Sequence, residues 1–193
     1  AKPGAVCRHE FTVGKAGPRV FEVTARRNGS SLDAVLTLRK ASGGKPLAQW
    51  DDVTNKVFVG TIPQGECDPI GRFDFTEPGC YVAEVTDRTG HGGKGYFWDM
   101  EVRPPEPDFE VYSTRSTLPL YRGRALSMDF AIVRKDGFTG PVTLEFPKDV
   151  RVRGNVITAG VDRITASVTY VGRKHLDLRS VKISARGKVD GRT

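Results

Sequence analysis

The residues of this 193-residue chain that come nearest to a chemical site are aspartates. A hard cation such as calcium needs several oxygen ligands, which the loops at one end of a β-sandwich can gather. We therefore predict a candidate calcium site at Asp33, Asp51, Asp52 and Asp87, and no other cofactor. In the alternative, which we favour, Asp33 and Asp87 accept hydrogen bonds from turn amides and Asp51 and Asp52 begin a solvated turn.

Three cysteines, Cys7, Cys67 and Cys80, bear on redox chemistry. Cys67 and Cys80 flank an expected strand and hairpin turn, so a disulfide between them is geometrically reasonable and would leave Cys7 unpaired. Other pairings stay open, as does the alternative of three free buried thiols. Their spacing does not match a zinc site.

Covalent or hydrolytic catalysis usually needs a histidine that is oriented by a partner and reaches a nucleophile. The three histidines are His9, His91 and His175, and each is expected on the surface. The sequence contains neither a Gly-x-Ser-x-Gly elbow nor a His-Glu-x-x-His motif. We therefore predict that the chain is not an enzyme and has no catalytic residues.

The elements that would position these side chains are strands. Apolar residues alternate with polar ones over residues 32–38, 96–102, 126–132, 142–146 and 181–185. Such alternation is typical of strands with one buried face, because successive side chains point to opposite sides of a sheet. Turn signals such as Asn28-Gly29 and Asp136-Gly137 recur between them, and no long segment has a helical apolar pattern. The fold class predicted is all-β and antiparallel.

A proline-rich segment, Arg103-Pro104-Pro105-Glu106-Pro107, follows the first set of strands. Prolines at this density favour an extended connector and cannot pair within a central strand. We predict two antiparallel β-sandwich domains of the jelly-roll or immunoglobulin-like type: residues 1–103, a Pro-rich linker at 104–108, and residues 109–193.

A family resemblance rests on an ordered set of segments in the first half. These are Arg19-Val20-Phe21-Glu22-Val23, Gly29-Ser30-Ser31-Leu32-Asp33, Leu36-Thr37-Leu38, Asp51-Asp52, Arg72-Phe73-Asp74-Phe75, Pro78-Gly79-Cys80-Tyr81 and Val85-Thr86-Asp87. The set resembles the bacterial pre-peptidase C-terminal (PPC) domain, which is related in fold to the collagen-binding domains of bacterial collagenases. Residues 53–69 depart from that pattern, with the apolar run Val57-Phe58-Val59 in place of a polar loop. The second half, around Arg134-Lys135-Asp136-Gly137-Phe138, looks like an immunoglobulin-like sandwich.

The resemblance implies a non-catalytic accessory module of a larger exported bacterial protein of the protease-associated type. Such a module would serve adhesion, substrate attachment or stabilisation, and some relatives bind calcium through clustered carboxylates. The implied location is secreted, periplasmic or at the cell surface. The expected partners are other domains of the same polypeptide and an extracellular protein or polysaccharide, without membrane insertion.

The charged and aromatic residues bear on two further classes of partner, nucleic acids and carbohydrates. The net charge is +7, and residues 104–193 carry 16 basic against 10 acidic side chains. Around Lys182 and Arg186 an outward basic row can bind phosphate or sulfated glycan, or protect an edge strand, and we prefer the second. No aromatics stand among these bases, so nucleic acid is not expected. The alternative function is a carbohydrate-binding module that stacks sugars on exposed aromatics, drawn from Trp50, Trp98, Tyr81, Tyr96 and Phe97.

Overall fold

The computed structural model of the chain describes residues 2–59, 62–115, 117, 119–172 and 182–189; within 53–66 it describes the backbone only. The described part is built of strands, and every strand pair with a defined register is antiparallel. Its one helical element is a single 3-10 turn at Arg26–Asn28. The prediction of an all-β, antiparallel fold is confirmed. The chain divides into two compact units, residues 1–55 with 65–106, and residues 56–64 with 107–193.

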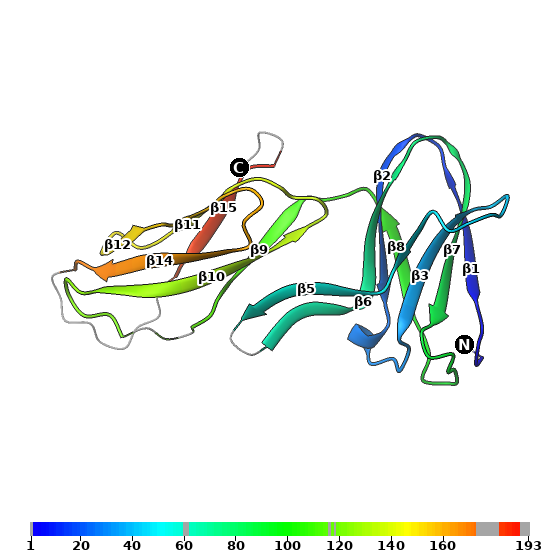
Figure 1. Cartoon of the computed structure of the whole chain (residues 1–193), viewed down its shortest axis with the longest axis horizontal. Helices are drawn as coiled ribbons and strands as arrows, with labels where there is room; N and C mark the ends of the chain where they lie inside the picture. The colour runs from blue at the N-terminus through cyan, green and yellow to red at the C-terminus, as the bar shows by residue number, and fades with distance from the viewer. Residues whose placement is uncertain (1, 60–61, 116, 118, 173–181, 190–193) are drawn as a thin grey trace. The chain divides into compact units, whose positions relative to one another are not determined.

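Two four-stranded sheets form most of the first unit, which is β-sandwich-like (Figure 1). One sheet has the order β1 (Cys7–Val13), β7 (Gly79–Asp87), β3 (Ala34–Lys40) and β4 (Ala48–Trp50). The other has the order β5 (Asp52–Val59), β6 (Ile62–Phe75), β2 (Gly17–Thr24) and β8 (Asp99–Arg103).

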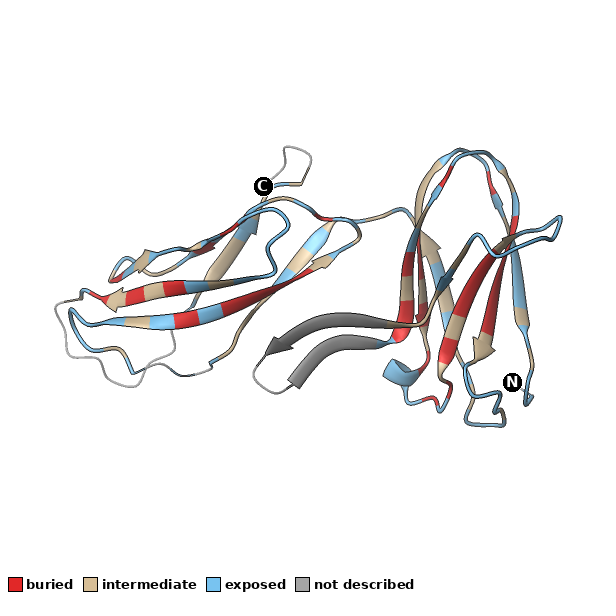
Figure 2. Cartoon of the chain, viewed as in Figure 1, coloured by how far each residue is buried: buried red, intermediate tan, exposed pale blue. Residues whose placement is uncertain are grey.

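The core of the first unit lies between these sheets (Figure 2). In β3, Ala34, Leu36 and Leu38 are buried, as their alternation in the sequence predicts. Along the neighbouring strand β7 every residue from Tyr81 to Val85 is buried, so this strand is covered on both faces. The predicted segment at 96–102 supplies four partly buried apolar side chains, although β8 begins only at Asp99.

A side chain of the first sheet fills the space above a glycine of the second sheet. Phe21 of β2 is opposite Gly71 of β6, and a Cβ atom on Gly71 would lie 2.1 Å from ring atoms of Trp50. The Trp50 ring occupies this space and stacks on Phe21, with 5.7 Å between ring centroids and 20° between planes. Trp50 is therefore part of the packing between the sheets.

A four-stranded and a three-stranded sheet form the second unit. One has the order β12 (Val150–Arg153), β14 (Arg163–Tyr170), β10 (Ala125–Lys135) and β9 (Asp108–Ser113). The other has the order β13 (Val156–Ile157), β11 (Val142–Glu145) and β15 (Ser184–Gly187). Their shared core contains Phe130, Ile132, Val142, Leu144 and Val168. The turn after β10 has positive φ at both Asp136 (51°) and Gly137 (86°), which matches its predicted role.

The predicted turn at Asn28-Gly29 lies between β2 and β3. Asn28 ends the 3-10 turn and Gly29 follows in the left-handed conformation, with φ of 82°. Gly29 tolerates this φ because it has no Cβ. In the described part of the chain, no helix has the length and apolar character needed to cross a membrane.

Candidate functional site

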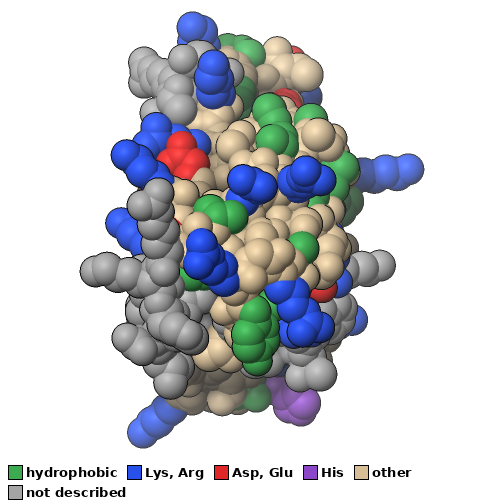
Figure 3. Space-filling model, turned by 90° about the vertical axis from the view of Figure 1, so that its left-hand side faces the viewer, with side chains coloured by type: hydrophobic (Ala, Val, Ile, Leu, Met, Phe, Trp, Pro, Cys, Tyr) green, Lys and Arg blue, Asp and Glu red, His purple; other side chains and the backbone are tan. Residues whose placement is uncertain are grey.

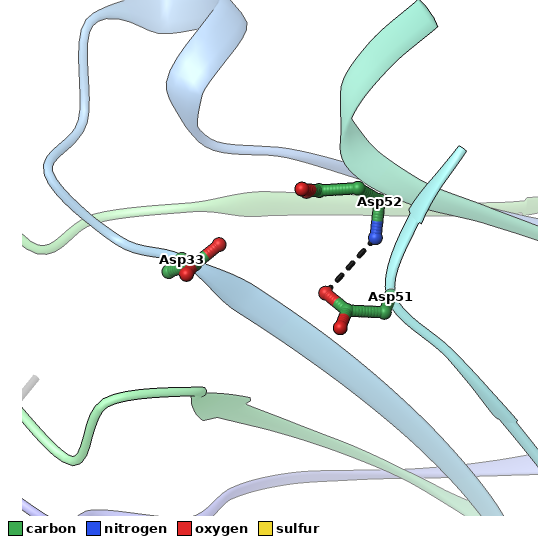
Figure 4. Close-up of side chains that lie close together, drawn as sticks. All are labelled: Asp33, Asp51 and Asp52. Carbon is green, nitrogen blue, oxygen red and sulfur yellow. Dashed lines mark hydrogen bonds between the residues drawn. The ribbon is translucent and has the colours of Figure 1, made fainter. Parts of the chain in front are cut away.

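Three of the four predicted ligand residues meet at one place in the first unit. Asp33 lies just before β3, Asp51 just after β4, and Asp52 begins β5. One side-chain oxygen of each can be chosen so that the three atoms lie within 4.8 Å of one another (Figure 4). The β3–β4 register explains the convergence. Because Leu36 is opposite Trp50, the residue just before β3 is close to the residues that follow Trp50.

The charges in this cluster are only partly balanced. An Arg88 Nη1 atom lies 2.7 Å from an Asp51 oxygen, and an Arg26 Nη2 atom lies 3.3 Å from Asp33 Oδ1. The backbone amide of Asp52 donates to Asp51 Oδ1 at 2.9 Å. By contrast, Asp52 Oδ1 is a buried oxygen that accepts no hydrogen bond, and Asp33 Oδ1 is also without one despite the nearby guanidinium.

The pKa of Asp52 reflects this setting. Burial raises it above its ordinary value of 3.8, and repulsion from Asp33 and Asp51 raises it further. Attraction by Arg26 and Arg88 opposes the shift without cancelling it. Three half-buried carboxylates therefore share two guanidinium partners. The repulsion that these partners do not offset falls on Asp52, whose pKa is raised.

This arrangement can hold a hard cation. Carboxylate oxygens are the ligands that calcium prefers, and the three side chains offer up to six of them. A bound cation would place a positive charge beside the Asp52 carboxylate. The guanidinium groups of Arg26 and Arg88 would compete with that cation for the oxygens of Asp33 and Asp51. The same residues can alternatively form an ion-pair network without a metal.

Asp87, the fourth predicted ligand, is not part of the cluster. Its carboxylate accepts the Asp33 amide at 2.9 Å, the Thr89 hydroxyl at 2.6 Å and the amides of Thr89 and His91 at 3.1 and 2.8 Å. Burial would raise the pKa of Asp87, but these hydrogen bonds lower it below 3.8. The structure gives Asp87 the turn-stabilising role that the sequence offers as the alternative.

Asp68 is a polar centre whose role the sequence did not reveal. Its side chain is fully buried and accepts the backbone amides of Ala25, Arg26 and Arg27 at 3.0, 2.8 and 3.1 Å. It thereby holds the 3-10 turn against β6. The amides that it accepts lie more than 40 residues away in sequence, so no local motif marks the contact.

The predicted Cys67–Cys80 disulfide is not formed. All three cysteines are free, with Cys67 and Cys80 exposed. Cys80 lies directly after the turn between β6 and β7, whereas Cys67 is eight residues before the end of β6. At ~3.3 Å per residue this separates Cys67 from the turn by roughly 25 Å. The two strands also belong to different sheets, so no disulfide can join these residues.

The histidines and aromatics have different surroundings. His9 lies on the exposed part of the edge strand β1, and His91 Nδ1 is 2.6 Å from the Thr89 hydroxyl; His175 falls outside the described residues. Tyr81 is buried, and Trp50, Tyr96 and Trp98 pack against the core. Among these predicted sugar-stacking residues only Phe97 is strongly exposed, at 48%.

The predicted basic row lies partly outside the described residues, since 173–181 are not described. Within the described part, β15 pairs with β11, and Arg186 Nε lies 3.1 Å from a carboxylate oxygen of Glu145. Arg186 thus serves a cross-strand ion pair.

The fold and the cluster define a class: an all-β, sandwich-like protein with a three-carboxylate cluster where the chain passes from β4 to β5. No family model matches the chain, and no solved structure matches it. A curated relative, probable UDP-arabinopyranose mutase 1 from Pisum sativum, is 25% identical over 158 residues. The match covers 75% of this chain and 42% of the relative, so the chain spans less than half the length of that protein.

This match corrects one prediction. We predicted that the chain is not an enzyme, and the relative bears the name of an enzyme, so that prediction is wrong on this finding. The prediction depended on the absence of a few local motifs. Catalytic groups that folding brings together from distant positions leave no such motif, so their absence excluded only a few chemistries.

Proposed function

We propose that the chain is a binding and stabilising module of a larger exported bacterial protein of the protease-associated type. It comprises a PPC-like sandwich (1–103), a Pro-rich linker (104–108) and an immunoglobulin-like sandwich (109–193), and serves adhesion, substrate attachment or stabilisation. Its partners are other domains of the same polypeptide and an extracellular protein or polysaccharide. Its location is secreted, periplasmic or at the cell surface.

The observation that carries this proposal is the convergence of Asp33, Asp51 and Asp52. Asp51 follows the last strand of one sheet, and Asp52 begins an edge strand of the other. A calcium ion bound here would hold the crossover between the sheets and neutralise the repulsion at Asp52. Calcium is abundant outside cells, where modules bind it with dissociation constants of about 0.1–1 mM. A cation-stabilised sandwich therefore suits an exported protein.

Calcium titration followed by thermal unfolding tests the proposal. At ten times the dissociation constant, calcium should stabilise the chain by about 1.4 kcal/mol. Asp52→Asn should abolish this gain because it removes the ligand charge. The control is Asp99→Asn, which changes an exposed aspartate elsewhere in the same unit and should leave the gain unchanged. An unchanged melting temperature at millimolar calcium would show that the cluster is an ion-pair network and would remove the calcium claim.

A second candidate function is supported by the match to the mutase. We propose that the chain belongs to an enzyme that acts on a nucleotide sugar, as the name of the relative indicates for that protein. Incubation with UDP-arabinopyranose and chromatographic analysis of the products tests this. Conversion that increases with protein concentration would support it, and an unaltered substrate would reject it for this chain.

A further inference from the structure

The outer face of the β12–β14–β10 sheet carries hydroxyl and guanidinium groups. Val150 and Val152 of β12 pack towards the core, so the alternating residues Arg151 and Arg153 point outwards. Arg151 is opposite Thr169 of β14, and Arg153 is opposite Ser167. The two rows continue onto β10 at Ala125 and Ser127.

The two arginines are exposed, and within the described part of the chain no ion pair or hydrogen bond engages their side chains. Other strands of this unit differ. Arg186 pairs with Glu145 across β15 and β11, and Lys135 pairs with Glu110 across β10 and β9. Unneutralised guanidinium groups beside hydroxyls indicate a surface suited to anions.

Positive charge extends beyond β12 at this end of the unit. Arg122 forms a bridge with Tyr170, the last residue of β14, and Arg124 directly precedes β10. Both side chains are exposed. Figure 3 shows this end of the chain with many Lys and Arg side chains and few Asp and Glu side chains. On the outward face Asp129 of β10, two strands from β12, accepts the Thr165 hydroxyl at 2.6 Å, and Asp149 directly precedes β12.

The spacing and chemistry favour a linear polyanion. Arg151 and Arg153 are two residues apart on one strand, about 7 Å. Each guanidinium can bind a sulfate or carboxylate group through two parallel hydrogen bonds. Sheets that bind single-stranded nucleic acid carry stacking aromatics at their central outward positions. Here those positions hold Ser127, Ser167 and Thr169, which can donate to sugar hydroxyls and sulfates but cannot stack bases.

We infer that this face, formed by Arg151, Arg153, Ser127, Ser167 and Thr169, binds a sulfated polysaccharide. This inference rests on the proposed attachment function, because it names the ligand to which the module would attach. The surface lies in the second unit and the carboxylate cluster in the first, so the two claims fail separately. The result of the heparin-binding experiment therefore does not affect the interpretation of the calcium titration.

Size-defined heparin oligosaccharide is the probe, measured with the full chain by fluorescence anisotropy over a range of salt concentrations. Arg151→Ser with Arg153→Ser should weaken binding roughly tenfold to thirtyfold and lower the slope of log K against log salt by about two. The control is Lys15→Ser with Lys45→Ser, which removes the same charge from exposed positions in the first unit. It should bind as the unchanged chain does.

Three outcomes would overturn the inference. They are no heparin binding at physiological salt, an equal loss in both double variants, and displacement of heparin by a single-stranded oligonucleotide at equal charge concentration. Circular dichroism verifies folding of each variant. If the serine variant does not fold, Arg151→Gln with Arg153→Gln removes the same charges with longer side chains, and the same loss is expected.

Discussion

The carboxylate of Asp68 accepts the Nε–H of Arg27 at 3.2 Å and the backbone amide of the same residue at 3.1 Å. Asp68 has no exposed surface, and it also accepts the amides of Ala25 and Arg26. One buried carboxylate thus satisfies three consecutive amides at the start of the 3-10 turn, while the Asn28 amide donates to the Ala25 carbonyl at 3.0 Å. Charge-assisted hydrogen bonds of this kind are among the strongest in proteins.

Asp68→Ala should therefore be strongly destabilising. Removing the carboxylate leaves buried amide donors without an acceptor, at a cost of about 3 kcal/mol in the free energy of unfolding. Urea denaturation measures the change. The control on the same strand is Asp74→Ala, which alters a side chain that is 68% exposed and paired with Arg72. It should change stability by less than about 0.5 kcal/mol. Equal effects of the two substitutions would contradict the assignment.

Acid should remove the contribution of Asp68. Burial raises its pKa, but the backbone hydrogen bonds of Ala25, Arg27 and Arg26 outweigh burial and bring it below 3.8. A carboxyl group whose pKa is lower in the folded state stabilises folding above its unfolded pKa and loses that effect as the pH falls. The stability difference between the unchanged chain and Asp68→Ala should be constant near neutral pH and shrink below about pH 4. A difference that grows on acidification would contradict this sign.

Alternation in the sequence was sufficient to predict the core-facing residues of the strands, but it missed positions that are buried on the opposite face, such as Ala131 and Val133 of β10. Leu36, Leu38, Phe130 and Ile132 are buried as their period of two requires, because the alternation is a local property of the strand. The contacts of Asp68 were not predictable in this way, since they depend on which strand passes the 3-10 turn.

The candidate site depends in the same way on strand pairing. Asp33 and Asp51 come together because β3 and β4 form a hairpin with Leu36 opposite Trp50, a register that the sequence alone leaves undefined. The predicted Cys67–Cys80 disulfide failed for the related reason that β6 is long and continues for eight residues after Cys67 before the turn to β7. Sequence proximity to a turn was mistaken for spatial proximity.

Gly71 is predicted to tolerate no side chain. A methyl group there would meet the Trp50 ring at 2.1 Å, and the ring is held by its stacking on Phe21. Gly71→Ala should cost about 2–3 kcal/mol in the free energy of unfolding, by overpacking the space between the sheets. Gly14→Ala is the control, because a methyl group at Gly14 would have no other atom within 4 Å. A red shift of tryptophan fluorescence should accompany the loss of stability only in Gly71→Ala.

Thiol titration should distinguish the structure from the disulfide predicted by the sequence. With Cys67 and Cys80 exposed and free, a thiol reagent should modify both rapidly in the folded chain, and Cys7, half-buried, more slowly. Cys67→Ser should remove one rapidly reacting thiol and leave the other. If only Cys7 reacted before reduction, the bridge would be present and the separation of the strands would be wrong.

Asp33 and Asp87 should respond differently to calcium although the sequence placed them in one ligand set. Asp33 contributes an oxygen to the cluster, so Asp33→Asn should weaken or abolish calcium-dependent stabilisation. The oxygens of Asp87 are occupied by the amides of Asp33, Thr89 and His91, so Asp87→Ala should lower stability by about 2 kcal/mol in calcium-free buffer. It should still show a calcium-dependent rise in melting temperature, because the cluster keeps its three carboxylates. Thermal unfolding of both variants with and without calcium measures the contrast. Equal loss of the calcium response in both would mean that Asp87 is a ligand, and that the site extends beyond Asp33, Asp51 and Asp52.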